Sequence, residues 1–101
     1  FKVVLECLDT GRCWVKLSGP NRFSAEPGLP YSDTTPFARA LIERNPDRLL
    51  WGSDWPHPDH FEAMPNDGDM IDLMLDWAPD EALRKKIFTD NPTELFGFPV
   101  V

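Results

Sequence analysis

The sequence predicts an α/β fold in which two parallel strands are joined by a helix. The first observation is a segment of alternating apolar and polar residues at 13–18, which ends at Gly19. The second is a largely apolar run at residues 49–53, which leads into Asp54 and a Trp-Pro-His-Pro turn. Between them, residues 35–44 have the spacing of an amphipathic helix. Strand, helix and strand form a βαβ unit, whose two strands run parallel.

The chain before this unit is expected to begin with a helix. Four apolar residues recur at the spacing of one helical face: Phe1, Val4, Leu5 and Leu8. Gly11 is expected to end the helix in a left-handed conformation. The first strand follows, and its alternation separates Val15 and Leu17 from Lys16 and Ser18 on the opposite face.

The connecting helix has a start and a stop signal. Thr35 stands before Pro36, the order expected of a cap followed by the first helical residue. Asn45-Pro46 ends the helix, because the residue before a proline avoids helical backbone. In the second strand, alternation places Leu50, Gly52 and Asp54 on one face.

The remaining segments are loops and helices. Residues 21–34 and 59–68 contain turn residues without a clear period, so both are expected to be loops. Helices are expected at about 70–77, with Asp69 as the cap, and at 81–89. A short final helix is expected to begin with Asn91 as its cap and Glu94 as the capping-box partner, and to end at Gly97.

Composition and charge exclude several classes of partner. Seventeen acidic and ten basic residues give a net charge of −7, and the basic residues form no cluster beyond 84–86. Nucleic acid and anionic membranes are therefore not expected as partners. The sequence contains no apolar run long enough to cross a membrane. Cys7 and Cys13 have no disulfide-framework spacing, and we expect them to be small core residues in a reducing, cytoplasmic compartment.

Three motifs give the chain a family resemblance. They are Trp-Val-Lys-Leu-Ser-Gly-Pro at residues 14–20, Leu-Trp-Gly-Ser-Asp-Trp-Pro-His at 50–57 and Asn-Pro-Thr-Glu-Leu-Phe-Gly at 91–97. Together they resemble the amidohydrolase-related (amidohydrolase 2 type) TIM-barrel hydrolases, and most closely the 2-pyrone-4,6-dicarboxylate lactonase-like branch. A complete (β/α)8 barrel needs roughly 250 residues. The resemblance therefore implies that residues 1–101 are a single C-terminal portion, about the last two βα units plus terminal helices.

Asp54 is the candidate catalytic residue. It stands where a buried strand opens into a loop, the position at which α/β enzymes carry their chemistry. The alternative is a turn-forming Asp that caps nearby backbone N–H groups. In the resembled family, the carboxylate at the end of the last strand is the general base that activates water, and in metal-dependent members it also touches the metal. The resemblance therefore leaves open whether the full-length protein binds a divalent metal such as zinc or none. His57 and His60 are too few to complete a zinc site with Asp54.

Four further residues are candidate substrate contacts: Arg22, Ser18, His57 and Trp55. In the lactonase-like branch, the Gly-Pro-x-Arg arrangement that ends in Arg22 places an arginine against a substrate carboxylate, a task that suits a planar guanidinium. The alternative for Arg22 is a solvated loop arginine. Lys16 is a weaker candidate, because a lysine on the inner face of a strand needs an anionic partner. We expect His60 to lie on the surface.

The resemblance implies a hydrolase that acts on a small carboxylated lactone or a similar C–O bond. The 101-residue chain is expected to be inactive alone, because most of such a site lies in other strands. Two alternatives remain open. One is a metal-dependent decarboxylase of the same superfamily, and the other is a non-catalytic acidic domain that binds a protein partner. The sequence leaves the oligomeric state open.

Overall fold

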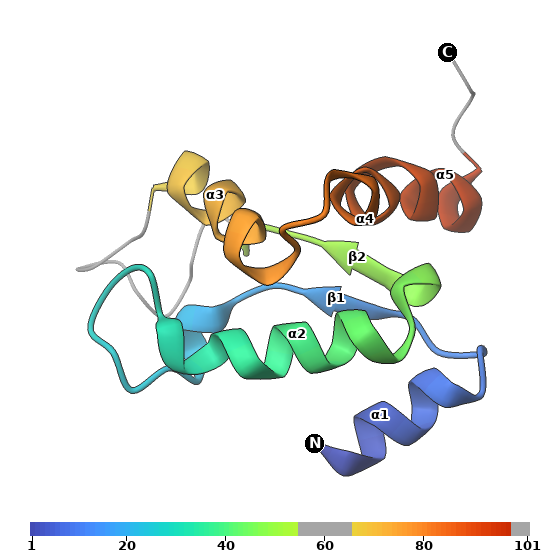
Figure 1. Ribbon diagram of the computed structural model, residues 1–101, viewed down its shortest axis with the longest axis horizontal. Coiled ribbons are helices and arrows are strands. Elements are labelled where there is room, and N and C mark those ends of the chain that lie inside the picture. Colours follow the sequence, from blue (N-terminus) through green and yellow to red (C-terminus); the bar gives the residue numbers. More distant parts are fainter. Residues whose placement is uncertain (55–65, 98–101) are drawn as a thin grey trace.

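The computed structural model describes residues 1–54 and 66–97 of the chain (Figure 1). Its larger elements are α1 (Lys2–Asp9), β1 (Val15–Leu17), α2 (Thr35–Arg44), β2 (Leu49–Trp51), α3 (Asp67–Trp77), α4 (Glu81–Lys85) and α5 (Asn91–Phe96). Short helical turns connect them: η1 (Pro20–Arg22), η2 (Ser32–Thr34), η3 (Pro46–Arg48) and the wider π-type turn η4 (Lys86–Asp90). The mixture of helices and strands agrees with the predicted α/β class.

The two strands form the predicted parallel pair. Val15 lies opposite Leu49, and Leu17 lies opposite Trp51. The backbone N–H of Gly52 donates to the carbonyl of Leu17 at 3.2 Å, which extends the pairing one residue beyond β2. Since α2 connects the two strands, the βαβ unit predicted from the sequence is confirmed (Figure 1). Both strands are shorter than the predicted 13–18 and 49–53.

One face of this sheet carries the core. Leu17 and Leu49 are buried on the side of the sheet that the helices cover, and Trp51 on the same side packs against Phe88 of η4, with ring centroids 5.5 Å apart. The helices contribute the remaining buried apolar side chains, among them Leu8, Leu41, Ile42, Leu73, Met74, Trp77 and Ile87. Alternation along the strands therefore places every second residue in a packed interior, as expected of a sheet covered by helices.

Two helix starts, those of α3 and α2, differ from the prediction. Helix α3 is capped by Asn66, whose amide oxygen accepts from the N–H groups of Gly68 and Asp69, so Asp69 lies inside the first turn. In α2 the cap position is Thr34, one residue before the predicted Thr35. In both cases two nearby residues are good caps: Asn66 and Asp69 for α3, and Thr34 and Thr35 for α2. The sequence alone therefore does not show which of the two begins the helix.

Asn91 does not cap α5, which corrects the predicted capping box. The backbone runs on from η4 into α5 without a break, and the Asn91 side chain is buried. Its amide nitrogen donates to the carbonyl oxygens of Pro46 at 2.7 Å and Leu49 at 2.9 Å. Asn91 therefore ties the last helix to the start of β2. The predicted end at Gly97 is confirmed, with a left-handed φ of 70°.

The amphipathic stripe of α1 is only partly buried. Leu8 is fully buried, whereas Phe1 and Val4 are exposed. Gly11 has the expected left-handed backbone, with φ 71°. Within residues 1–54 and 66–97, no helix is long and apolar enough to cross a membrane.

Candidate functional site

The site forms where the chain leaves the two parallel strands. Arg22 lies in η1, which follows β1, and Asp54 lies three residues beyond β2. The Arg22 Nε donates to Asp54 Oδ2 at 2.7 Å, and Nη2 donates to Oδ1 at 3.3 Å. The two side chains are 41% and 23% exposed, so the pair is accessible at the rim of the sheet. This two-point contact is the strong form of a guanidinium–carboxylate interaction and fixes the plane of the carboxylate.

The structure thus joins two residues to which the sequence analysis gave separate tasks. Arg22 was predicted to bind a carboxylate of the substrate, and in the structure its guanidinium contacts the carboxylate of Asp54. Among the described residues, the Asp54 oxygens accept from Arg22 and from no backbone N–H. The alternative in which Asp54 caps backbone N–H groups of the turn that follows it concerns residues outside the described ranges and stays open. The backbone of Asp54 is left-handed, with φ 64°.

Gly19 makes room for this pair, a role that the sequence analysis missed. Its φ of 58° is left-handed. A Cβ at this position would stand 3.1 Å from Arg22 Cδ and 3.4 Å from Asp54 Oδ2. Both its conformation and its surroundings therefore favour glycine. The sequence analysis used Gly19 as the end of a strand and as part of the Gly-Pro-x-Arg arrangement. A glycine between a strand and a candidate arginine is also a usable signal of close packing.

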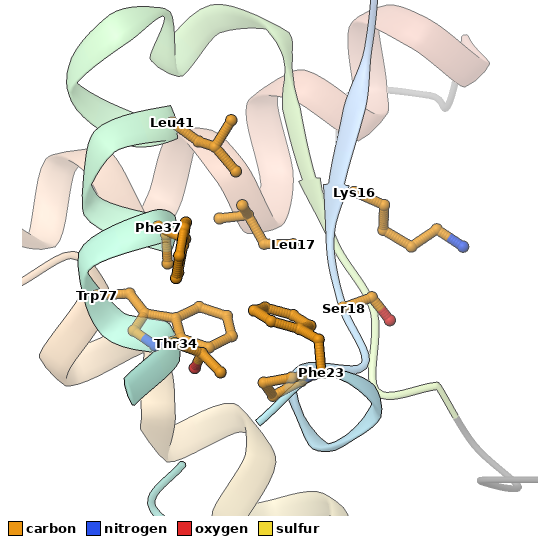
Figure 2. Close-up of a pocket in the computed structure, with 10 residues that line it drawn as sticks. Lys16, Leu17, Ser18, Phe23, Thr34, Phe37, Leu41 and Trp77 are labelled. Atoms are coloured by element: carbon orange, nitrogen blue, oxygen red, sulfur yellow. The ribbon is translucent and has the colours of Figure 1, made fainter. Parts of the chain in front are cut away.

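The same side of the sheet carries a short row of residues, which we call the open face: Lys16, Ser18, Leu50 and Gly52. A Cβ on Gly52 would stand 2.9 Å from Lys16 Cδ and 3.4 Å from Ser18 Oγ. Figure 2 shows Lys16 and Ser18 pointing to one side of β1 while Leu17 and Leu41 lie on the other. The predicted placement of Ser18 and Lys16 on the face that leads to Asp54 agrees with this geometry.

A small cavity lies on the opposite, helix-covered side of β1. It has a volume of about 90 Å³, and its lining is mostly apolar (Figure 2). Leu17, Phe37, Leu41 and Trp77 contribute to this lining. The Trp77 indole nitrogen is buried and has no hydrogen-bond partner within the described residues. Since the Arg22–Asp54 pair is not part of this lining, we regard the cavity as a packing feature of the core.

The loop after Arg22 is organised by two acidic side chains that the sequence analysis did not single out. Glu26 accepts from the backbone N–H groups of Ser32 at 2.9 Å and Asp33 at 2.8 Å. Asp33 accepts from the backbone N–H of Ala25 at 2.7 Å and from the hydroxyl of Ser24. Hydrogen bonds from Ser32 and Asp33 lower the pKa of Glu26, and those from Ser24 and Ala25 lower the pKa of Asp33. These local contacts give shape to a segment that has no periodic pattern.

The other predicted site residues lie outside the described ranges. Trp55, His57 and His60 belong to residues 55–65, so their predicted roles remain untested. Residues 1–54 and 66–97 contain no group of three or more His, Cys, Asp or Glu side chains that could hold a metal ion. Both Asp54 oxygens also face a guanidinium, which repels a cation. The described residues by themselves do not fit a metal site.

In a comparison with known protein families, residues 1–98 match the family described as amidohydrolase. A 4-sulfomuconolactone hydrolase from Rhizobium radiobacter is 52% identical over 99 residues, covering 96% of this chain and 33% of that protein. A 2-pyrone-4,6-dicarboxylate hydrolase from Comamonas testosteroni is 42% identical over 82 residues, covering 81% of this chain and 27% of that protein.

Two further similarities come from Agrobacterium. A D-galactarolactone isomerase from Agrobacterium fabrum is 37% identical over 95 residues, covering 92% of this chain and 32% of that protein. A crystal structure of an Agrobacterium tumefaciens protein without ligand superimposes with a TM-score of 0.83 at 35% identity, covering 97% of this chain and 35% of that one. The chain therefore spans about a third of the length of the curated relatives that it matches.

Proposed function

The chain belongs to the amidohydrolase family, and from this membership we propose that it forms the carboxyl-terminal part of a (β/α)8-barrel lactone hydrolase. In this proposal β1 and β2 are the last two barrel strands, and the terminal helices complete the outer layer. Three observations support it: the parallel βαβ unit, the helices on one side of the sheet, and the share of about a third of each relative that the chain covers. In such barrels the site lies at the carboxyl ends of the strands.

The observation that carries the proposal is the Arg22–Asp54 contact at that end of the sheet. We assign Asp54 the role of general base. Its carboxylate would take a proton from the attacking water while the water oxygen bonds to the lactone carbonyl carbon. The ring C–O bond then breaks, and the proton passes to the leaving alkoxide. One acid–base group at one position is sufficient for both proton transfers.

Arg22 has two proposed tasks. Its guanidinium holds the Asp54 carboxylate in one orientation, which is the task that the printed distances support. Its second task is to contact a carboxylate of the substrate at the accessible rim. A guanidinium carries five N–H donors, so one side chain can bridge two carboxylates. Arg22 would then contact both the base and the substrate. Binding of the substrate carboxylate to Arg22 would therefore also position the substrate relative to Asp54.

The proposed substrate is a small lactone that carries acidic groups. The relatives are named for a sulfonated lactone and for a pyrone with two carboxylates. An arginine at the rim suits an anionic substituent of either kind. Ser18 on the open face, together with Trp55 and His57, completes the proposed set of contacts. We derive no step through a metal, because the described residues do not fit one.

The decisive variant is Asp54→Asn in the longer protein that carries this chain. Removal of the base is expected to lower kcat by on the order of 10² to 10⁴ while the protein stays folded. Asp72→Asn, on the exposed surface of α3, is the matched control for the loss of one negative charge and is expected to leave kcat unchanged. Unchanged kinetics for Asp54→Asn would remove the base assignment and favour a binding domain. Loss of activity on chelation would favour the metal-dependent decarboxylase.

A lactone isomerase is a second candidate, favoured by the similarity to D-galactarolactone isomerase. In that reaction Asp54 would take the proton of a substrate hydroxyl, whose oxygen attacks the carbonyl carbon in place of water. The original ring C–O bond then breaks, and the proton passes to the alkoxide that leaves. Turnover in ¹⁸O-labelled water separates the two. Hydrolysis places one labelled oxygen in the new carboxylate, whereas isomerisation leaves the product unlabelled.

A further inference from the structure

Lys16 is the central residue of β1 and lies on the open face. Its backbone pairs in register with Leu50, yet its Cδ lies 2.9 Å from the point where a Cβ of Gly52 would stand. Gly52 is two residues beyond Leu50, a distance of about 6.6 Å at the usual rise along a strand. The lysine side chain therefore leans along the sheet toward its carboxyl end, where Asp54 lies.

Gly52 is what permits this direction. Any side chain at residue 52 would occupy the space through which the Lys16 methylenes pass, since 2.9 Å is shorter than carbon atoms approach without overlap. Ser18 Oγ borders the same space, at 3.4 Å from that point. Figure 2 shows Lys16 and Ser18 projecting together from β1, away from the helix-covered side. The Lys16 side chain thus extends over the open face, on the same side of β1 as Ser18.

The charge of Lys16 is not compensated within the described part of the chain. Five other basic side chains of this part form ion pairs: Arg22, Arg44, Arg48, Lys85 and Lys86. Arg39 and Arg84 donate to backbone carbonyls, and Lys2 and Arg12 resemble Lys16 in having no ion pair among the described residues. No hydrogen bond or ion pair of the Lys16 ammonium is found among residues 1–54 and 66–97. The acid nearest in the row, Asp54, is held by Arg22 at both oxygens. Lys16 is exposed in the structure. In the proposed barrel it would face the interior, where an ammonium requires an anion.

We propose that Lys16 binds a second anionic substituent of the substrate, so that the site selects lactones with two acidic groups. One group lies at Arg22 on the rim, and the other lies deeper, at the Lys16 ammonium beside Ser18. This inference rests on the proposed function, because it requires that the open face is the substrate site. It adds a specificity residue that selects the substrate and takes no part in proton transfer.

The test compares Lys16→Met with the unaltered longer protein in binding three probes by calorimetry. The probes are pyridine-2,4-dicarboxylate and its two monocarboxylates, at positions 2 and 4. They carry the two carboxylates of the pyrone diacid on a ring without an ester bond, so the protein cannot hydrolyse them. Methionine keeps the length of the side chain and removes its charge. We expect the variant to lose on the order of 10- to 100-fold in affinity for the dicarboxylate and for one monocarboxylate, and to bind the other monocarboxylate as before. Lys16→Arg is expected to restore most of the lost affinity.

Lys2→Met is the matched control, because Lys2 is an exposed lysine of α1 away from the open face. It is expected to change none of the three affinities. Equal losses for all three probes with Lys16→Met, or no loss at all, would overturn the proposal. So would failure of the unaltered protein to bind the dicarboxylate, since the proposal requires a site for two anions.

The Asp54→Asn variant distinguishes a failure of the general-base assignment from a failure of the Lys16 proposal. Calorimetric binding requires no turnover, so the Lys16 pattern can be measured whatever Asp54 does. If Asp54→Asn keeps full activity, the base assignment fails while the Lys16 result stands on its own. If the Asp54 variant is inactive and Lys16→Met binds every probe normally, only the second-anion site is lost.

Discussion

The two faces of the β1–β2 sheet differ sharply in what they contact. On one face, Leu17 and Leu49 are buried under helices and contribute to a continuous apolar core. On the other, Lys16, Ser18 and Gly52 form a polar row that ends at the Arg22–Asp54 pair. The residues of the two faces alternate along the same two strands, so one segment of chain serves both packing and the candidate site.

This difference shows that the two faces of the same strands have different roles, one in stability and the other in the candidate site. The covered face gains stability by removing apolar surface from water. The open face holds groups whose value lies in binding and proton transfer. Substitutions on the two faces should therefore separate stability from activity, and the predictions below test that separation in the longer protein.

The largest effect is expected on the covered face. Leu49→Ala removes a fully buried side chain, and it should destabilise the protein by about 2–5 kcal/mol in urea unfolding. Ser18→Ala, on the open face, is the contrasting variant. It should change stability by no more than about 0.5 kcal/mol and raise KM several-fold. The separation fails if Ser18→Ala is as destabilising as Leu49→Ala, or if its kinetics are unaltered.

An intermediate effect is expected at Gly19. Gly19→Ala places a side chain at φ 58°, which costs roughly 1–2 kcal/mol, and its Cβ would press on Arg22 from 3.1 Å. Stability and kcat should both fall. Gly11→Ala is the matched control, because Gly11 has φ 71° and no atom within 4 Å of the added Cβ. It should lose similar stability with kcat unchanged, and a kcat loss equal to that of Gly19→Ala would show that strain alone is responsible.

The smallest effect is expected in the stability of the Glu26–Asp33 loop at low pH. The pKa values of Glu26 and Asp33 are lowered by hydrogen bonds in the loop. A lowered carboxyl pKa contributes stability above its unfolded value, which is 4.5 for Glu26 and 3.8 for Asp33. That stability is lost as pH falls through the lower, folded pKa. Below about pH 4 the loop amides of Ser32 and Asp33 should lose protection. Their hydrogen exchange, measured by mass spectrometry, should approach the rate of an unstructured peptide at the same pH.

Glu26→Gln provides the comparison for the acid prediction. Glutamine keeps the size of the side chain but has no charge to lose, so the loop of this variant should exchange faster at neutral pH and change less on acidification. Equal pH responses of the two proteins would mean that the Glu26 carboxylate does not hold the loop.

The regular elements were predictable from the sequence where a pattern repeats. Apolar spacing identified α2, and alternation with a turn identified both strands and their parallel pairing. The same alternation placed Lys16, Ser18, Gly52 and Asp54 on one side. These predictions succeed because burial of one face imposes a period on the sequence.

Single side chains with several possible partners were predicted less well. Asn91 has the signature of a helix cap, but its amide binds two carbonyls that lie more than forty residues away. The contact between Arg22 and Asp54 was not predicted either, because the sequence analysis gave the two residues separate tasks. The Glu26 and Asp33 loop has no period at all. A local sequence pattern does not show which distant group will accept a hydrogen bond from a given donor. Such contacts can be identified only in the folded structure, where the two groups lie close together.

The left-handed backbone at residue 54 also limits how this site can vary. Few residue types adopt positive φ without strain, and aspartate and asparagine are the usual ones besides glycine. A glutamate here would carry the same acid on a backbone that resists it, and its longer arm would miss the guanidinium plane. Among the three residue types that adopt this backbone with least strain, only aspartate has a carboxylate that can accept a proton from water.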